Sequence, residues 1–254
     1  MSRPGQRQRV LADASSGVAR AAGFSGWVFD VHATHLDPRQ PWEYEALARE
    51  QASRAARVLD LGTGGGERLS EIIKGLPCRT VATEEWHVNA PVAARRLAPF
   101  GVDVVRCSSL RLPLAAASFD LVLDRHEALE PAEAARVLAP GGAVITQQVG
   151  PDNWPELRRV FPRMTDYGDH YNAYLRGFTA AGLIIDDARR HEERVAFGGI
   201  ADVAYMLAVA PWSVADFEPE RDLDALCALE DACGTPDGIV LTEMRYIIRA
   251  HRPS

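Results

Sequence analysis

Residues 58–66 (V-L-D-L-G-T-G-G-G) combine residue types and spacing that can bind a small ligand. An apolar run ends at Asp60, and Gly62, Gly64 and Gly66 then alternate before a helical stretch begins. Glycine suits a tight loop because it tolerates positive φ and lets a ligand approach the backbone closely. Free N–H groups at a helix start favour an anion, whereas the acid at the strand end favours an ammonium group. The segment therefore predicts a strand, a loop and a helix that bind an amino acid headgroup.

The same loop can be compared with the dinucleotide-binding fingerprint, which has glycine at its first, third and sixth positions. Counted from Gly62, the sixth position is Glu67. A carboxylate at this position would crowd and repel a diphosphate. A nicotinamide oxidoreductase is therefore the second hypothesis, and a strand-to-helix turn that binds nothing is the structural alternative.

A second strand is expected over residues 79–84, and it ends in Glu84 and Glu85. An acid at this point of a strand–helix–strand unit can accept hydrogen bonds from both hydroxyls of a ribose. Trp86 follows directly and can lie against the face of an adenine. We therefore expect a nucleoside here, while a solvated loop acid is the alternative for Glu84.

Four segments in this order resemble the motifs of the class I S-adenosylmethionine-dependent methyltransferases. Residues 60–66 resemble motif I, and Glu84 matches the acid of the second strand. Residues 107–123 are similar to the stretch that the family writes as G-D-A-x-x-L-P-F followed by S-F-D-x-V. Residues 138–142 resemble the L-x-P-G-G turn. The resemblance covers about residues 55–150 and is closest to the branch that methylates small molecules.

The resemblance implies an α/β fold with a Rossmann-like, seven-stranded, mostly parallel sheet and helices on both faces. An N-terminal helical extension and an insertion before the last strand complete this fold. The implied division is 1–50 for the extension or lid, 51–190 for the cofactor-binding core, 191–240 for a lid-type insertion and 241–254 for the final core strand. Because strand and helix patterns alternate, parallel strands are expected at 58–61, 79–84, 102–106, 119–124 and 142–148.

The implied cofactor is S-adenosylmethionine, with its methionine part on the glycine loop and its ribose on Glu84. The residues expected to bind it are Asp60, Gly62, Thr63, Gly64, Gly66, Glu84, Glu85, Trp86, Ser108, Ser109 and Asp124. Ser108 stands where the family usually has an aspartate that accepts from the adenine amino group. A neutral hydrogen bond contributes about 0.5–1.5 kcal/mol and a charged one about 1.5–3 kcal/mol, so Ser108 predicts weaker adenine binding. The N–H of Ser109 could compensate.

The acceptor is expected beyond the carboxyl end of the strand over 119–124, where ligands of open α/β sheets bind. His126 is the expected general base because an imidazole titrates near neutral pH, and an idle loop histidine is the alternative. Arg125 would orient an acidic acceptor or pair with Glu127. The candidates on the acceptor side are Arg125, His126, Gln147, Tyr44 and Trp212, with Gln148, Trp42, His170 and Tyr171 as further pocket or lid candidates.

The expected activity is transfer of a methyl group to an O, N or C nucleophile of a small or medium organic acceptor (EC 2.1.1.-). Two alternatives stay open besides the oxidoreductase. One is an rRNA or tRNA methyltransferase, and the other is a regulatory module that binds the cofactor without turnover.

Composition narrows the class of partner. The formal net charge is −7, whereas nucleic-acid binders usually carry a basic face, so no nucleic-acid partner is expected. No apolar run reaches the length of a membrane span, and no apolar signal core follows the basic N-terminus. A cytoplasmic monomer or homodimer without membrane contact is therefore expected.

A metal site was considered at residues 30–37, where His32 and His35 lie between Asp30 and Asp37. Histidines three apart on a helix can chelate zinc. Because Pro38 follows and no third ligand is fixed by spacing, no metal is expected.

Overall fold

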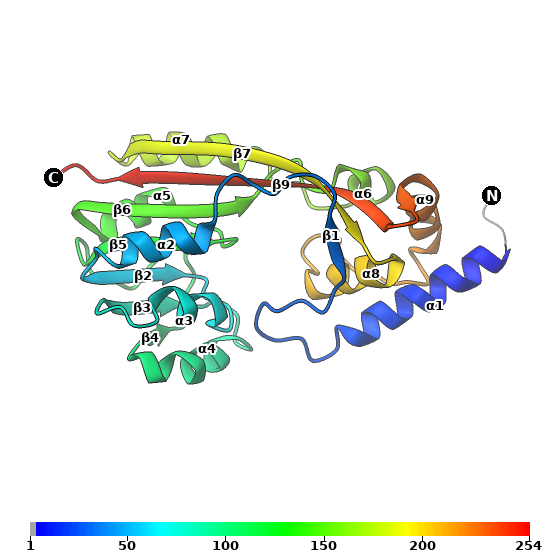
Figure 1. Ribbon diagram of the computed structural model, residues 1–254, viewed down its shortest axis with the longest axis horizontal. Coiled ribbons are helices and arrows are strands. Elements are labelled where there is room, and N and C mark those ends of the chain that lie inside the picture. Colours follow the sequence, from blue (N-terminus) through cyan, green and yellow to red (C-terminus); the bar gives the residue numbers. More distant parts are fainter. Residues whose placement is uncertain (1–3) are drawn as a thin grey trace.

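The computed structural model describes residues 4–254, which fold around one mixed sheet of nine strands (Figure 1). The strand order is β1-β7-β9-β6-β5-β2-β3-β4, with β8 paired to β9. The strands are β1 (Ala33–His35), β2 (Arg57–Leu61), β3 (Arg79–Thr83), β4 (Asp103–Val105), β5 (Phe119–Arg125), β6 (Leu138–Val149), β7 (Ile184–Phe197), β8 (Gly234–Thr235) and β9 (Gly238–His251).

The central strands are parallel, as the sequence pattern predicted. Leu59 of β2 pairs with Val81 of β3 on one side and with Val122 of β5 on the other. β9 runs antiparallel to both β6 and β7. The Rossmann-like fold is thus confirmed, although nine strands replace the expected seven. The two additions are short: β1 pairs with the far end of β7, and β8 pairs with the start of β9.

Helices cover both faces of the sheet. α2, α3 and α4 pack on one face around Val58, Leu121 and Leu123, and α5 and α7 pack on the other around Leu59 and Val122. We call this part the core. The helices are α1 (Pro4–Arg20), α2 (Tyr44–Ala52), α3 (Glu67–Ile73), α4 (Ala90–Leu97), the short 3-10 helix η1 (Ala98–Phe100), α5 (Pro131–Val137), α6 (Pro155–Val160), α7 (His170–Ala180), α8 (Ile200–Val209) and α9 (Leu223–Cys233).

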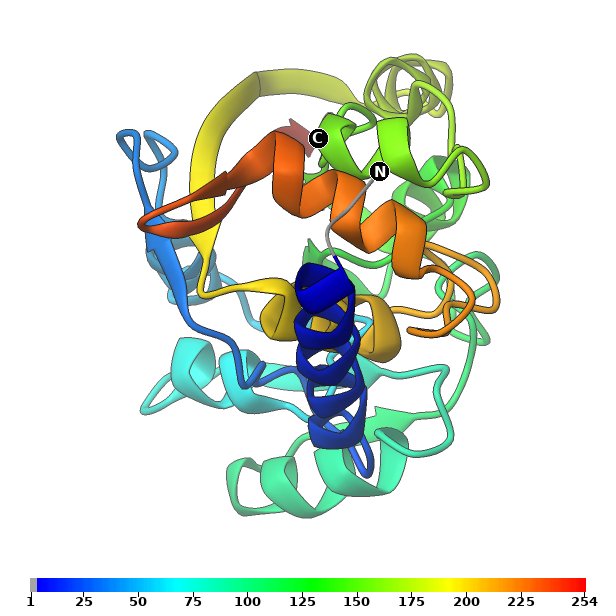
Figure 2. The ribbon, with the colours of Figure 1, turned by 90° about the vertical axis from the view of Figure 1, so that its right-hand side faces the viewer.

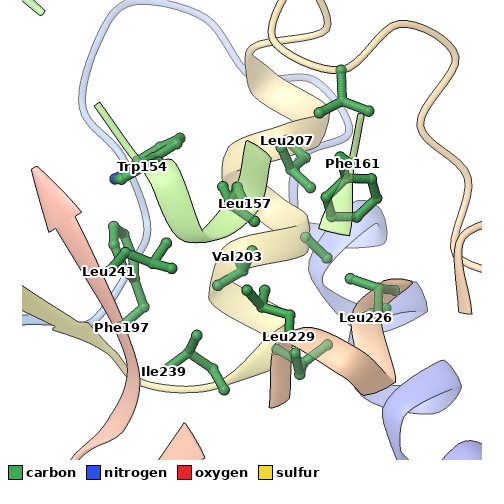
Figure 3. Packing of buried hydrophobic residues seen from close by; sticks show 14 of the residues in the cluster. Trp154, Leu157, Phe161, Phe197, Val203, Leu207, Leu226, Leu229, Ile239 and Leu241 are labelled. Atoms are coloured by element: carbon green, nitrogen blue, oxygen red, sulfur yellow. The ribbon is translucent and has the colours of Figure 1, made fainter. Parts of the chain in front are cut away.

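The remaining helices, α1, α6, α8 and α9, form a second unit that we call the cap. They enclose their own hydrophobic cluster with the distal ends of β7 and β9. Figure 3 shows Leu157 of α6 and Phe161, which directly follows α6, near Val203 of α8 and Leu229 of α9. Figure 2 views the cap from its outer side, with α1 in front. The long antiparallel strands β7 and β9 therefore connect two separately packed regions.

The observed boundaries differ from the expected division. Residues 191–197 and 238–240, expected in the insertion, continue β7 and β9, because the two strands stay paired as far as Phe197 and Ile239. The expected extension over 1–50 is divided as well: α1 packs in the cap, whereas α2 packs in the core. Residues 1–3 of that extension lie outside the described residues. No helix among residues 4–254 is long and apolar enough to cross a membrane.

Candidate active site

The loop between β2 and α3 has the conformation that its glycines predict. Gly62, Gly64 and Gly66 have φ values of 59°, 64° and 80°, which other residues rarely adopt. The N–H of Thr63 donates to the carbonyl oxygen of Thr83 at 2.8 Å and ties the loop to β3. The hydroxyl oxygen of Thr63 is buried without a hydrogen-bond partner. The hydroxyl lies beside Asp60 and favours the charged form of that carboxylate.

Four carboxylates surround this loop. Asp60 lies near the end of β2, Glu84 follows β3, Asp124 lies near the end of β5, and Glu127 follows β5. The first three are buried and Glu127 is half-buried. Within residues 4–254, none of these four acids forms an ion pair with a Lys, Arg or His side chain. The site therefore gathers four acids that the described residues leave without a cationic partner.

Burial raises the pKa of each of these acids, because it disfavours the charged form. The pKa rises to about 7 for Asp60 and to about 7 for Glu127. Burial also raises the pKa of Glu84, and that of Asp124 rises well above its usual value. The charges of Glu84 and Glu85 further raise the pKa of Glu127. A cation placed among these acids would lower their pKa values, whereas a diphosphate would be repelled.

Glu84 and Asp124 are held by hydrogen bonds to neutral groups. Glu84 accepts from the N–H of Gly64 at 2.7 Å and from the N–H of Trp86 at 2.8 Å. Asp124 accepts from the Thr146 hydroxyl and from the Gln148 amide, each at 2.7 Å, through one carboxylate oxygen. Its other oxygen is buried without a partner. Glu84 thus supports the glycine loop directly. The Gln148 amide donates to Asp124 and is therefore already occupied within the protein.

Sequence reasoning missed Glu127 as a site residue. Its side chain lies against the loop, because a Cβ added to Gly62 would lie only 2.5 Å from Glu127 Cγ. Gly62 therefore leaves room for this carboxylate. The alternative ion pair between Arg125 and Glu127 is not formed. The signal in the sequence was the run D-R-H-E directly after a predicted strand.

The backbone at His126 explains how Glu127 reaches the loop. His126 has a positive φ of 64°, which turns the chain sharply after β5. Two contacts from β6 fix this turn: the N–H of His126 donates to the carbonyl oxygen of Gln147 at 2.8 Å, and the Gln148 amide donates to the carbonyl oxygen of Glu127 at 2.7 Å. Histidine is among the residues that tolerate this region.

A basic region adjoins the acids. Successive strand residues point to opposite faces, so Arg125 and Asp124 diverge. Arg125 is half-buried on the face covered by α2, beside Gln147 in the register of β5 and β6. Gln147 is buried, and its oxygen accepts from the Trp42 indole N–H at 2.8 Å. The Gln147 nitrogen lies 3.4 Å from His126 Nε2.

His126 is exposed at the end of β5, and one side of its ring lies against the Gln147 amide. The protein around the ring, together with the charges of Arg125, Arg245 and Arg68, lowers its pKa well below the usual value. His126 is therefore neutral at neutral pH, which is the state that a proton acceptor requires.

The residues expected near adenine follow two neighbouring strands, β3 and β4, at the same edge of the sheet. Trp86 is 39% exposed, and Glu85 and His87 are exposed. Ser109 is buried. The hydroxyl of Ser108 accepts from the N–H of Leu110 at 3.4 Å, so it supports a local turn in this structure.

Residues 21–43, which we call the strap, connect α1 to α2 and pass between the cap and the core (Figure 1). A Cβ added to Gly64 would lie 2.0 Å from Trp27 Cδ1, so the indole packs on the glycine loop. Trp27 also meets Trp212 edge to face, with ring centroids 6.0 Å apart. The N–H of Gly26 donates to the Asn89 side chain at 2.7 Å. Sequence reasoning missed Trp27, because it lies outside every motif.

The expected lid residues differ in their surroundings. Trp42 and Tyr44 are buried in the hydrophobic cluster under α2 and form no mobile lid, whereas Trp212 is 52% exposed and meets Trp27. His170 and Tyr171 pack against Tyr246, away from the loop contacts described above.

The residues considered for a metal pair with other groups. His35 contacts Glu193 at 2.7 Å and Asp37 pairs with Arg194 at 2.8 Å. Within the part of the chain that the structure describes, no group of three or more His, Cys, Asp or Glu side chains could hold a metal ion.

The residues around the glycine loop fit S-adenosylmethionine. Its ammonium and sulfonium groups are cations, and the loop is bordered by Asp60, Glu84, Asp124 and Glu127 without cationic partners. The unpartnered hydroxyl of Thr63 offers a hydrogen bond. One feature limits this fit: Trp27 occupies the space over Gly64 and would have to shift for a ligand to contact that glycine.

Comparisons with known proteins agree with this geometry. Residues 59–146 match the family model described as a methyltransferase domain. A comparison with curated proteins gave no match.

Three solved structures illustrate the similarity of the fold. The [4+2]-cyclase SpnF is 19% identical, with 98% of this chain and 94% of that chain covered and a TM-score of 0.55. A functionally unknown protein from Deinococcus radiodurans R1 is 16% identical, with 97% and 98% covered and a TM-score of 0.61. A geranyl diphosphate methyltransferase in complex with S-adenosylmethionine is 15% identical, with 89% and 100% covered and a TM-score of 0.50. The chain therefore contains a segment, residues 59–146, that matches a methyltransferase domain, and its fold is similar to those of the three structures.

Proposed function

We propose that this protein transfers the methyl group of S-adenosylmethionine to a small or medium organic acceptor. The observation that supports this most strongly is the set of four acids around the glycine loop, which have no cationic partner among the described residues 4–254. A ligand with two cationic groups would relieve their mutual repulsion, whereas a dinucleotide diphosphate would add to it. The proposal therefore favours S-adenosylmethionine over NAD.

The cofactor supplies an activated methyl group with a neutral thioether as leaving group. Asp60 and the glycine loop would hold its amino acid part, with Thr63 as an additional hydrogen-bonding group. Glu84 would accept from the ribose, and Trp86, Ser108 and Ser109 would border the adenine. These side chains come from the ends of β2, β3 and β4, so the sheet itself keeps them in fixed relative positions.

His126 is proposed to take the proton that the acceptor's nucleophile loses as it bonds to the methyl carbon. A neutral imidazole with a depressed pKa is ready for this role at neutral pH. The strap and the exposed Trp212 of the cap would cover the site and exclude water, which strengthens its electrostatic interactions. A negative protein of net charge −7 suits a small acceptor better than an RNA.

Calorimetric titration tests the proposal. S-adenosylmethionine and its demethylated product should bind the wild-type protein, and NAD should not. Asp60→Asn should weaken the binding of S-adenosylmethionine by about tenfold or more, because a charged contact is lost. Asp103→Asn, at an exposed acid of β4, is the matched control and should bind normally. The proposal fails if S-adenosylmethionine does not bind or if Asp60→Asn binds it as tightly as the control. Tight binding without turnover on any tested acceptor would favour the regulatory module.

A further inference from the structure

Arg125 is a half-buried cation with no partner. Within residues 4–254, its guanidinium takes part in no ion pair and no hydrogen bond, and its Nε atom is fully buried without a partner. The hydroxyl of Tyr44, which is only 2% exposed, is also buried without a partner. Buried polar groups are normally hydrogen-bonded, so two orphaned donors on one face of the sheet require an explanation.

The neighbours of Arg125 do not neutralise it. Glu45 is bound by Arg68, and Arg245 is bound by Glu243 and by Asn153. Burial, followed by the charge of Arg68, lowers the pKa of Arg125 to about 10. At neutral pH the group is still charged. An unpaired charge in such surroundings destabilises a fold, so its presence points to a ligand that completes it.

Three polar groups in this region can donate to a ligand: Arg125, Tyr44 and the Gln147 amide. The oxygen of Gln147 is occupied by Trp42 and Gln40, at 2.8 Å and 3.3 Å, which turns the Gln147 nitrogen toward His126. Arg125 and the nitrogen of Gln147 can only donate, and the unpartnered hydroxyl of Tyr44 has its proton free. A planar guanidinium suits a carboxylate, which can accept two parallel hydrogen bonds.

We propose that Arg125, with Tyr44 and Gln147, forms a subsite for a carboxylate group of the methyl acceptor. This inference rests on the proposed function, since the acceptor is the molecule that must lie beside His126. The acceptor is then a carboxylic acid whose nucleophilic atom is held near the imidazole while its anionic end is bound at β5. A carboxylate could also belong to the cofactor's own amino acid group, and the experiment separates the two sources.

The subsite can be tested with benzoate as the probe and benzamide as its neutral counterpart. Binding is followed by NMR, with the His126 ring resonances as the local reporter. Benzoate should bind the wild-type protein and raise the pKa of His126, because an anion would offset the charge of Arg125. Benzamide should do neither. Arg125→Gln should weaken the binding of benzoate by about tenfold or more, as expected for the loss of a charge-assisted contact. Arg95→Gln, at an exposed arginine of α4, is the matched control.

Two further measurements exclude other roles for Arg125. If Arg125 serves a ligand, Arg125→Gln should melt at the same temperature as the wild type or higher, because an unpaired buried charge is removed. A clear fall in the melting temperature, or failure to fold, would assign Arg125 a structural role and overturn the proposal. Equal benzoate affinity in Arg125→Gln and wild type would do so as well.

The affinity of Arg125→Gln for S-adenosylmethionine identifies the source of the carboxylate. We expect it to stay within about twofold of the wild type, because no contact of Arg125 with the cofactor is proposed. A loss comparable to that of Asp60→Asn would place the cofactor's carboxylate at Arg125 and contradict the acceptor subsite. If the wild type binds benzoate but not S-adenosylmethionine, the proposed function fails while the anion site stands.

Discussion

Buried acids have cationic partners in the cap but not in the described residues of the core. In the cap, Asp202 pairs with Arg20 and Asp222 pairs with Arg163, each at 2.6 Å. In the core, Asp60 and Asp124 are buried to a similar degree and have no cationic partner among residues 4–254. The same residue type at similar burial is therefore neutralised in one region and left unpaired in the other.

This difference indicates that the cap acids stabilise the fold, whereas the core acids are available to bind a ligand. The cap acids hold the cap together with the strap, since Asp202 also accepts from the N–H of His32 at 3.1 Å. The core acids weaken the fold by remaining unpaired, which is expected where a protein reserves groups for a ligand. The cap has a packed hydrophobic cluster of its own, so it can support the site from outside without supplying the cofactor contacts.

The largest expected effect is at the glycine loop. Gly64→Val should abolish cofactor binding, because a β-branched side chain would fill the space above the loop and is strained at a φ of 64°. Gly75→Val is the matched control, since Gly75 also has a positive φ, of 73°, but nothing within 4 Å of an added Cβ. Both variants should lose about 1–3 kcal/mol of unfolding free energy from backbone strain. Calorimetry should show binding only in the control, and equal affinities would remove the loop from the site.

The next largest effect is expected at Glu84, which directly follows β3. Glu84→Ala should weaken S-adenosylmethionine by about 1.5–3 kcal/mol, because it removes a charged acceptor and the support of the Gly64 N–H. Asp103→Ala, at the exposed acid of β4, is the control and should change the affinity little. A loss at Glu84 within measurement error would exclude its role at the ribose.

The comparison between core and cap predicts stability changes of opposite sign. Arg163→Met should lower the unfolding free energy by about 1–2 kcal/mol, because it leaves Asp222 with only the longer ion pair to Arg221, at 3.6 Å. The value is reduced because Arg163 is 40% exposed. Asp60→Asn should raise it by about 1–2 kcal/mol at pH 8, because the pKa of Asp60 is raised to about 7. The gain should vanish below about pH 4, where Asp60 is protonated in both the folded and the unfolded states. Urea denaturation measures both, and a destabilised Asp60→Asn would contradict the comparison.

The smallest expected effect concerns the strap. If Trp27 must leave Gly64 before a ligand enters, Trp27→Ala should tighten the binding of S-adenosylmethionine by roughly two- to fivefold. The substitution removes the state in which the indole covers the loop and competes with the ligand. Val28→Ala, at a 71% exposed side chain of the same strap, is the control. Weaker binding in Trp27→Ala would mean that the indole closes over the cofactor and does not compete with it.

The sequence predicted the core well because its signals are local. Strand and helix patterns alternate, and the glycines after Asp60 require a special backbone conformation, so β2 to β6 and the loop were predictable. β6 begins at Leu138, earlier than expected, because Leu138 pairs with Phe119 across a bulge. No local pattern marks such a pairing.

The cap and half of the site could not be predicted, because they depend on contacts between distant segments. Trp27 reaches Gly64 only through the path of the strap, and the lengths of β7 and β9 follow from their mutual pairing. Glu127 was visible as a charge after a strand, but the turn at His126 that places it against Gly62 was not. Tyr44 was assigned to the lid for its residue type, although its position at the start of α2 buries it.

Proton release on cofactor binding tests the central claim most directly. Because the pKa values of Asp60 and Glu127 are about 7 in the free protein, a bound cation should lower them and release protons below about pH 7. Calorimetry in buffers of different ionisation enthalpy should detect this release when S-adenosylmethionine binds. The release should be smaller with the demethylated product, which keeps its ammonium group but has a neutral thioether sulfur, and smaller again when S-adenosylmethionine binds Asp60→Asn. The affinity should rise with pH up to about 7. Binding of S-adenosylmethionine without proton release, and with an affinity independent of pH, would contradict the account.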